Sequence, residues 1–95
     1  MTVDRTPLRV EVTFTDGRRY PPDGPTYTAV CEVPGYAVAR VAWDLRIDVT
    51  NRMGRFLAGT ACYLADDAPW RELREVGAFS LHEGDLLVAF GRVLP

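Results

Sequence analysis

The segment Trp70–Val93, WRELREVGAFSLHEGDLLVAFGRV, decides which fold the rest of the chain has to complete. It begins with a short amphipathic stretch that stops at Gly77, turns at Gly84-Asp85 and ends in an apolar run that starts at Leu86. A glycine directly after a helical pattern is typical of a helix C-terminus. A Gly-Asp pair in front of an apolar run marks a turn that leads into a strand. The segment therefore predicts a short helix followed by a final strand over 86–93.

The sequence offers two candidates for the residue that caps the N-terminus of this helix. Asp66 or Asp67 is expected to cap the helix, and Pro69 suits its first turn. Trp70, Leu73 and Val76 then share one side of the helix, which is the side that would face a core. Trp70 either packs under its own helix or presents its ring on the surface.

Four further strands are expected before the helix, because apolar and polar residues alternate there with period two. In the clearest of them, Trp43, Leu45 and Ile47 share one face with Val41 and Val49, which predicts that Trp43 is a core residue. Gly59 is expected at a bulge or bend in the last of the four. The predicted strands cover residues 8–14, 27–33, 38–50 and 56–65.

Five strands with one short helix before the last strand predict an all-β fold. They are too few for a two-sheet sandwich with a separate helix layer, and closure into a small barrel removes the exposed strand edges. A chain of 95 residues is expected to form one domain over residues 1–95.

The composition narrows the classes of partner. The net charge is −2, with eleven Arg and no Lys, so binding to a nucleic acid would need a local arginine patch. With a single His and two separated cysteines, Cys31 and Cys62, no zinc site and no cofactor is expected, and both cysteines should be reduced. No apolar run spans a membrane and no signal peptide follows Met1, so a cytoplasmic protein without membrane contact is expected.

Two stretches resemble bacterial single-stranded DNA-binding proteins. From Trp70 the order of an aromatic residue, a short helix, Ser80-Leu81, Gly84-Asp85 and Gly91-Arg92 is similar to a run in that family, and GYAVARVAWDL (residues 35–45) is similar to its second-strand motif. The resemblance implies an OB-fold, a five-stranded barrel with a helix between its third and fourth strands. It also implies a last hairpin beyond Gly91-Arg92, which this chain does not contain. The strand 8–14 is therefore expected to fill the vacant place in a permuted barrel.

The resemblance implies binding of single-stranded DNA or RNA without sequence specificity, by stacking of aromatic side chains and by arginine contacts. Trp70 aligns with a stacking aromatic of the family, and Tyr63 and Phe56 lie in a strand that carries others, although a core position is favoured for Phe56. Asp44 and Asp48 alternate with the strand arginines, so a self-paired charged face is an equal alternative. The predicted arginine contacts are Arg40, Arg46, Arg52 and Arg55.

Other functions stay open beside nucleic-acid binding. The same barrel could serve protein–protein interaction, as an assembly subunit or homo-oligomer without affinity for nucleic acid. A different small β-rich fold such as a β-grasp module is a third reading. An enzyme is not expected, because Ser80 and His82 do not make a triad by proximity in sequence, and the glycines are scattered singly rather than gathered in a phosphate-binding loop.

Overall fold

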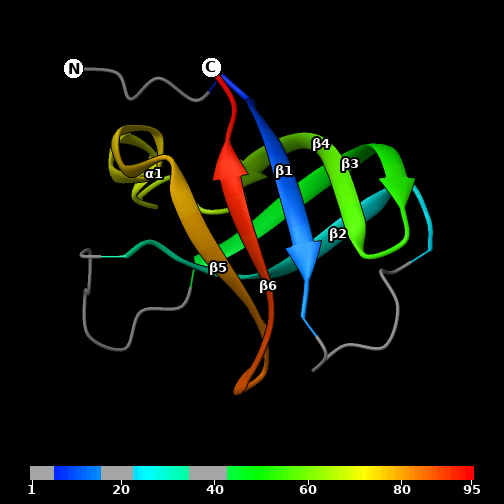
Figure 1. The fold of residues 1–95 in the computed structure, drawn as a ribbon. Coiled ribbons are helices and arrows are strands. Elements are labelled where there is room, and N and C mark those ends of the chain that lie inside the picture. The colour runs from blue at the N-terminus through cyan, green and yellow to red at the C-terminus, as the bar shows by residue number, and fades with distance from the viewer. Residues whose placement is uncertain (1–5, 16–22, 35–42) are drawn as a thin grey trace.

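The computed structural model describes residues 6–15, 23–34 and 43–95 of the chain. These residues form six strands and one short helix (Figure 1). In chain order the elements are β1 (Leu8–Phe14), β2 (Thr26–Glu32), β3 (Trp43–Met53), β4 (Phe56–Tyr63), α1 (Trp70–Val76), β5 (Ala78–Glu83) and β6 (Leu86–Val93).

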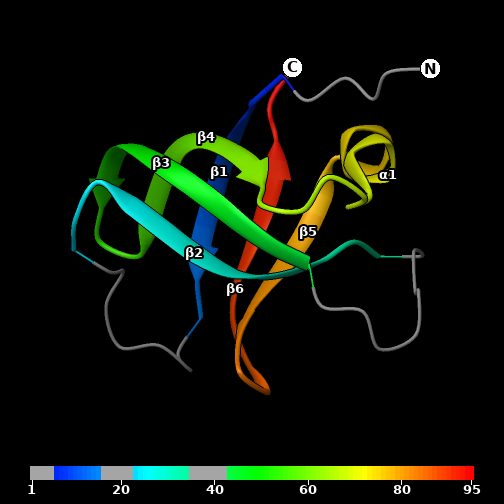
Figure 2. The same cartoon turned by 180° about the vertical axis from the view of Figure 1, so that it is seen from behind.

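The strands close into one antiparallel barrel in the order β1-β4-β3-β2-β5-β6. The predicted all-β barrel with one short helix is confirmed, with six strands rather than five. Helix α1 lies at one end of the barrel beside the start of β5, and the turn between β5 and β6 projects from the other end (Figures 1 and 2). Within the described part of the chain, no helix is long and apolar enough to cross a membrane.

The strand that the sequence did not predict is β5. Phe79 and Leu81 are buried there, while Ser80 and His82 between and after them are only partly buried. This alternation is the signal of a strand, but it covers only six residues and runs into the polar turn at Gly84. The hairpin of β5 and β6 ends in Gly91-Arg92 and is therefore a different one from the hairpin that the resemblance implies beyond these two residues.

Strand β1 lies inside the barrel, as expected, between β4 and β6. It pairs antiparallel with both neighbours, with Val12 opposite Leu57 on one side and opposite Gly91 on the other. β1 therefore closes the barrel, because without it β4 and β6 would both be edge strands.

The barrel interior holds one apolar core to which all six strands contribute buried residues. Trp43 lies partly buried against this core, and residues 35–42 of the predicted third strand lie outside the described residues. Helix α1 covers one end of the core with Trp70 and Leu73, whereas Val76 is exposed, contrary to the prediction.

The ends of α1 show one prediction confirmed and one wrong. Gly77 is the C-cap in the left-handed conformation with φ of 75°, and its N–H donates to the carbonyl of Leu73. At the other end the N-cap is Pro69, without a side-chain hydrogen bond, so neither Asp66 nor Asp67 caps the helix.

Candidate binding surface

The two aromatic residues predicted to stack on bases lie inside the protein. Trp70 is 3% exposed and Tyr63 is 4% exposed, and their rings pack edge to face with centroids 5.5 Å apart. The Tyr63 hydroxyl donates to the Cys31 sulfur at 3.6 Å, and the Trp70 indole nitrogen is buried without a hydrogen-bond partner among the described residues. Neither ring offers a face to a base in this conformation. The prediction of stacking is corrected here because α1 folds its own first residue over the end of the core.

The same buried cluster predicts a dependence of stability on alkaline pH. Burial raises the pKa of the Cys31 thiol from 9.0 to about 12, so the folded protein keeps the thiol neutral where the unfolded chain ionises. The stability that this preference contributes is complete below pH 9 and is lost as the pH rises toward 12. The expected loss is at most about 1.4 kcal/mol per pH unit.

Urea denaturation at several pH values checks this expectation. The Cys31→Ala protein should show a flatter loss of stability above pH 9 than the wild type. The variant Val33→Ala, which also truncates a buried residue, should lower stability at every pH and keep the wild-type slope. Equal slopes for wild type and Cys31→Ala would contradict the raised thiol pKa.

The three predicted arginines that the structure describes are not gathered into one phosphate track. Arg46 lies on the outer face of β3, and its Nε is 3.5 Å from Asp48 Oδ1. This ion pair agrees with the alternative prediction of a self-paired charged face. Arg52 donates to the carbonyl of Gly24, and Arg55 follows in the turn between β3 and β4. A strand rises about 3.3 Å per residue, so Arg46 and Arg52 lie about 20 Å apart along β3. Arg40 lies outside the described residues.

Exposed apolar side chains gather on another part of the barrel, which the sequence did not single out. Thr13 of β1 stands opposite Phe90 of β6 on one side and opposite Phe56 of β4 on the other. Phe56 in turn pairs with Met53 of β3. We call these four residues, Phe90, Thr13, Phe56 and Met53, the aromatic row. Its Phe90 is 56% exposed and its Met53 is 73% exposed, although outward positions of a strand are usually polar.

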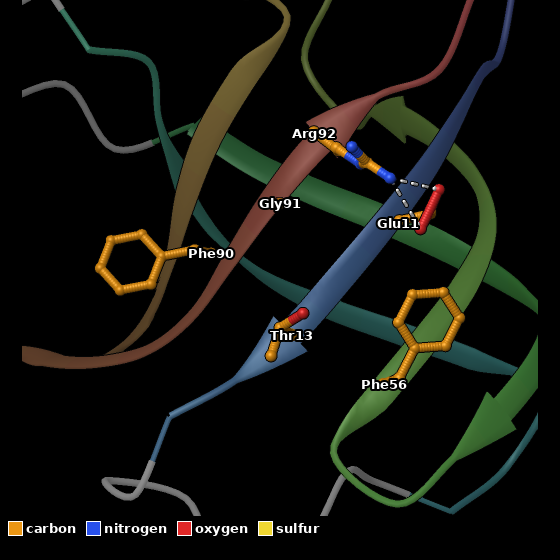
Figure 3. Close-up of a pocket in the computed structure, with 6 residues that line it drawn as sticks. All are labelled: Glu11, Thr13, Phe56, Phe90, Gly91 and Arg92. Atoms are coloured by element: carbon orange, nitrogen blue, oxygen red, sulfur yellow. Dashed lines mark hydrogen bonds and ion pairs between the residues drawn. The ribbon is translucent and has the colours of Figure 1, made fainter.

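The middle of the aromatic row is hollowed. A shallow open pocket of about 300 Å³ lies over Thr13 and Gly91, and Figure 3 shows the Phe90 and Phe56 rings on either side of Thr13. Arg92 and Glu11 form one flank of the pocket, with Arg92 Nη2 3.1 Å from Glu11 Oε1. The site therefore consists of two aromatic walls, a hydroxyl on its floor and a neutral ion pair beside it.

The outward position of Phe90 depends on an irregularity in β6. Val88 and Ala89 are both buried, and the pairing with β5 shifts register between Leu81 and His82. The extra residue reverses the alternation, so that Phe90 points outward although Val88, two residues earlier, points inward. Gly91 then has to stay a glycine, because a Cβ there would lie 2.3 Å from the ring of the buried Phe79.

A second polar cluster lies next to the aromatic row. Ser80 is opposite Phe90 on the neighbouring strand, and its Oγ lies 3.2 Å from His82 Nε2. Glu32 Oε2 lies 3.5 Å from the same ring nitrogen. Ser80 and His82 share a face because they are two residues apart, which the sequence interpretation overlooked. In a catalytic triad the carboxylate orients the histidine through its other ring nitrogen. Here Ser80 and Glu32 both approach the same ring nitrogen of His82, so the cluster does not have the geometry of a triad. We therefore assign it no catalytic role.

The described part of the chain contains no cluster of metal-binding side chains. Within residues 6–15, 23–34 and 43–95, no group of three or more His, Cys, Asp or Glu side chains could hold a metal ion. Both cysteines are free, Cys31 in the core and Cys62 partly exposed.

Comparison with known proteins does not identify a family for this chain. No family model matches the chain, and neither a curated protein nor a solved structure matches it. The resemblance to single-stranded DNA-binding proteins therefore stays a prediction, and any function has to be argued from the surface itself.

Proposed function

We propose that the protein is a non-enzymatic interaction domain that binds another protein through the aromatic row. The observation that carries this proposal is the exposure of Phe90 and Met53 in one register row with Phe56, on the outer face of a barrel whose core is already complete. Aromatic and methionine side chains are enriched in the cores of protein interfaces, whereas aligned exposed apolar residues cost solubility in a protein without a partner.

The charges beside the row favour a protein over a polyanion. Arg92 is paired with Glu11, so the flank of the pocket carries no net charge. The Glu11 carboxylate would also repel a phosphate placed on this flank, and the chain as a whole has a net charge of −2. A partner protein with a neutral apolar surface would be repelled neither by the Glu11 carboxylate nor by the net negative charge of the chain.

The proposal is tested by selecting ligands on the intact protein. A display library of random peptides is panned on the wild type, and its self-association is measured by sedimentation. We expect either enriched peptides or a dimer, and we expect Phe90→Asp to weaken that association about tenfold or more. Leu64→Asp, at an exposed apolar residue outside the row, is the matched control and should bind like the wild type. Unchanged binding by Phe90→Asp, or no association of any kind, would remove the proposal.

Single-stranded nucleic acid is the second candidate, and one observation favours it. Arg55 lies in the turn between β3 and β4, directly before Phe56 in the chain, and a cation next to an aromatic ring is the combination that single-strand binding uses. Such binding would use Phe56 and Phe90 in place of Trp70 and Tyr63. If a labelled oligothymidylate binds at low salt, and if Phe90→Ala and added salt both weaken that binding, the aromatic row belongs to nucleic acid and not to a protein.

A further inference from the structure

The seam between β2 and β5 closes the barrel along only part of β2. Strand β2 pairs with β3 from Thr26 to Cys31. With β5 it forms three residue pairs, Val30–His82, Cys31–Leu81 and Glu32–Ser80. Continued past His82, this ladder would place Gly84 opposite Thr28, but the chain turns there into β6, away from the start of β2 (Figures 1 and 2). The first half of β2 therefore has β3 on one side and no described strand on the other.

The bonding pattern of β2 shows which of its backbone groups face this open side. The Val49 N–H donates to the Pro25 carbonyl at 2.8 Å, so this pair bonds across the β2–β3 ladder. In an antiparallel ladder, residues that bond to one neighbouring strand alternate with residues whose N–H and C=O point away from it. The odd-numbered residues of β2 therefore bond to β3. The N–H and C=O groups of Thr26 and Thr28 point to the open side, where no residue of the described ranges bonds to them.

We call Thr26 and Thr28 the β2 edge. Both residues are exposed. Unpaired N–H and C=O groups along a strand are a template for another extended chain, because its backbone offers acceptors and donors at the same spacing. Strand edges are often protected by proline or by charged side chains, whereas the β2 edge carries two β-branched residues that favour strands. The chemistry of the edge therefore selects an extended backbone as its ligand.

The charges around the β2 edge determine which extended chain fits. Glu83 at the end of β5 accepts a hydrogen bond from the Tyr27 hydroxyl at 2.5 Å, so its carboxylate lies across the opening from β2. Asp85 follows in the turn and Asp23 precedes β2, and both are exposed. Arg52 donates to a carbonyl just before β2 and offsets one of these three charges. A second copy would bring its own carboxylates against them, whereas lysine or arginine side chains would pair with them.

We propose that the β2 edge binds an extended segment of another protein, rich in lysine or arginine, as an added antiparallel strand. Main-chain hydrogen bonds hold the segment to β2, and its basic side chains lie near Asp23, Glu83 and Asp85. This site lies between β2 and the turn after β5 and contains no residue of the aromatic row. It is a second binding site and does not rest on the function proposed above.

Amide hydrogen exchange measured by NMR tests the edge in the free protein. The Ala29 N–H bonds to β3, whereas those of Thr26 and Thr28 point to the open side. We expect the two threonine amides to exchange about tenfold faster than the Ala29 amide, or faster still. Equal protection of the three amides would show that the edge is already covered and would overturn the inference.

Fluorescence anisotropy with labelled peptides tests the ligand. The probe is a peptide of about eight residues, a usual strand length, in which lysine alternates with valine. One matched peptide carries glutamate in place of lysine, and two others carry N-methyl groups on one or the other set of alternate backbone nitrogens. We expect the lysine peptide to bind more tightly than the glutamate peptide and to slow amide exchange at Thr26 and Thr28. One N-methylated peptide should lose binding, because its methyl groups replace the N–H groups that face β2.

Variants of the protein locate the bound peptide. Thr28→Pro removes an N–H that faces the open side, a position where strands accept proline, and should weaken binding of the lysine peptide about tenfold. Thr28→Ala keeps the N–H and is the matched control, which should bind like the wild type. Asp85→Asn keeps the backbone of the edge intact and should also weaken binding of the lysine peptide. Thermal melting of each variant shows whether the fold is retained.

Several results would contradict the inference. It fails if the lysine peptide does not bind, if both N-methylated peptides bind as tightly as the parent, or if a folded Thr28→Pro protein binds like the wild type. Phe90→Asp should leave binding of the lysine peptide unchanged. If Phe90→Asp abolishes it, the peptide occupies the aromatic row, so the inference fails while the proposed function stands.

Discussion

Replacing Trp70 with alanine is expected to lower the free energy of unfolding by about 3–5 kcal/mol, the usual cost of removing a buried Trp or Phe side chain. Trp70 is 3% exposed and packs edge to face on Tyr63 under α1. For a domain of this length the change corresponds to a fall in Tm of at least about 12 °C, which thermal melting followed by circular dichroism would detect.

Two further variants separate a core role for Trp70 from a stacking role on the surface. Val76→Ala changes an exposed residue of the same helix and should alter stability by no more than about 0.5 kcal/mol. Trp70→Phe keeps an aromatic ring and removes the indole N–H that has no partner among the described residues, so it should cost less than Trp70→Ala. A Trp70→Ala protein that melts like the wild type would contradict the buried position and return Trp70 to the surface.

Replacing Gly59 with alanine should destabilise the barrel by about 1–3 kcal/mol or more, because the added Cβ meets the backbone. In the present structure this atom would lie 2.1 Å from the carbonyl oxygen of Asp48 and 3.1 Å from Cγ2 of Ile47. A flexible side chain could move away, but β3 is held by β2 and β4, so the β3–β4 ladder has to open.

Urea denaturation measures the effect of Gly59→Ala, with Cys62→Ala as the control. Cys62 lies on the same strand and is only partly buried, and its replacement adds no atom toward β3. We expect a clear loss of stability for Gly59→Ala and a small change for Cys62→Ala. Equal stability of the two variants would show that β3 and β4 do not approach as closely as described.

The two experiments bear on function as well as on stability. If Trp70 is required for the core, a loss of ligand binding in Trp70→Ala reports unfolding and says nothing about contact with the ligand. The surface variants Phe90→Ala and Leu64→Ala avoid this difficulty, because both side chains are largely exposed. The function is therefore best addressed through the aromatic row.

Alternation of apolar and polar residues was sufficient to predict most strands. Strand β1 was predicted at Leu8–Phe14 with the bounds that it has, and the last strand was predicted at Leu86–Val93 in the same way. Gly77 correctly marked the end of the helix, because its left-handed conformation is one that glycine adopts without strain. These features depend on neighbours in the chain, and the sequence displays them directly.

Other features depended on contacts that local patterns do not contain. A seven-residue helix could expose or bury Trp70, and the choice was made by the open end of the core that α1 covers. Strand β5 was missed because Ser80, His82 and Glu83 read as part of a polar turn, although Ser80 and His82 alternate with the buried Phe79 and Leu81. Strand β5 has only six residues, so the alternation of apolar and polar positions was too short to indicate a strand in a segment rich in polar residues.

The sequence by itself determined a small all-β barrel with one helix and an apolar interior, because periodicity and turn residues act over a few residues. The tertiary structure alone decided where the candidate site lies. Phe90, Thr13, Phe56 and Met53 come from four strands, and they meet only because barrel closure sets the register of β6, β1, β4 and β3. The outward direction of Phe90 follows from the register shift in the β5–β6 hairpin, which reverses the alternation that its apolar run suggests.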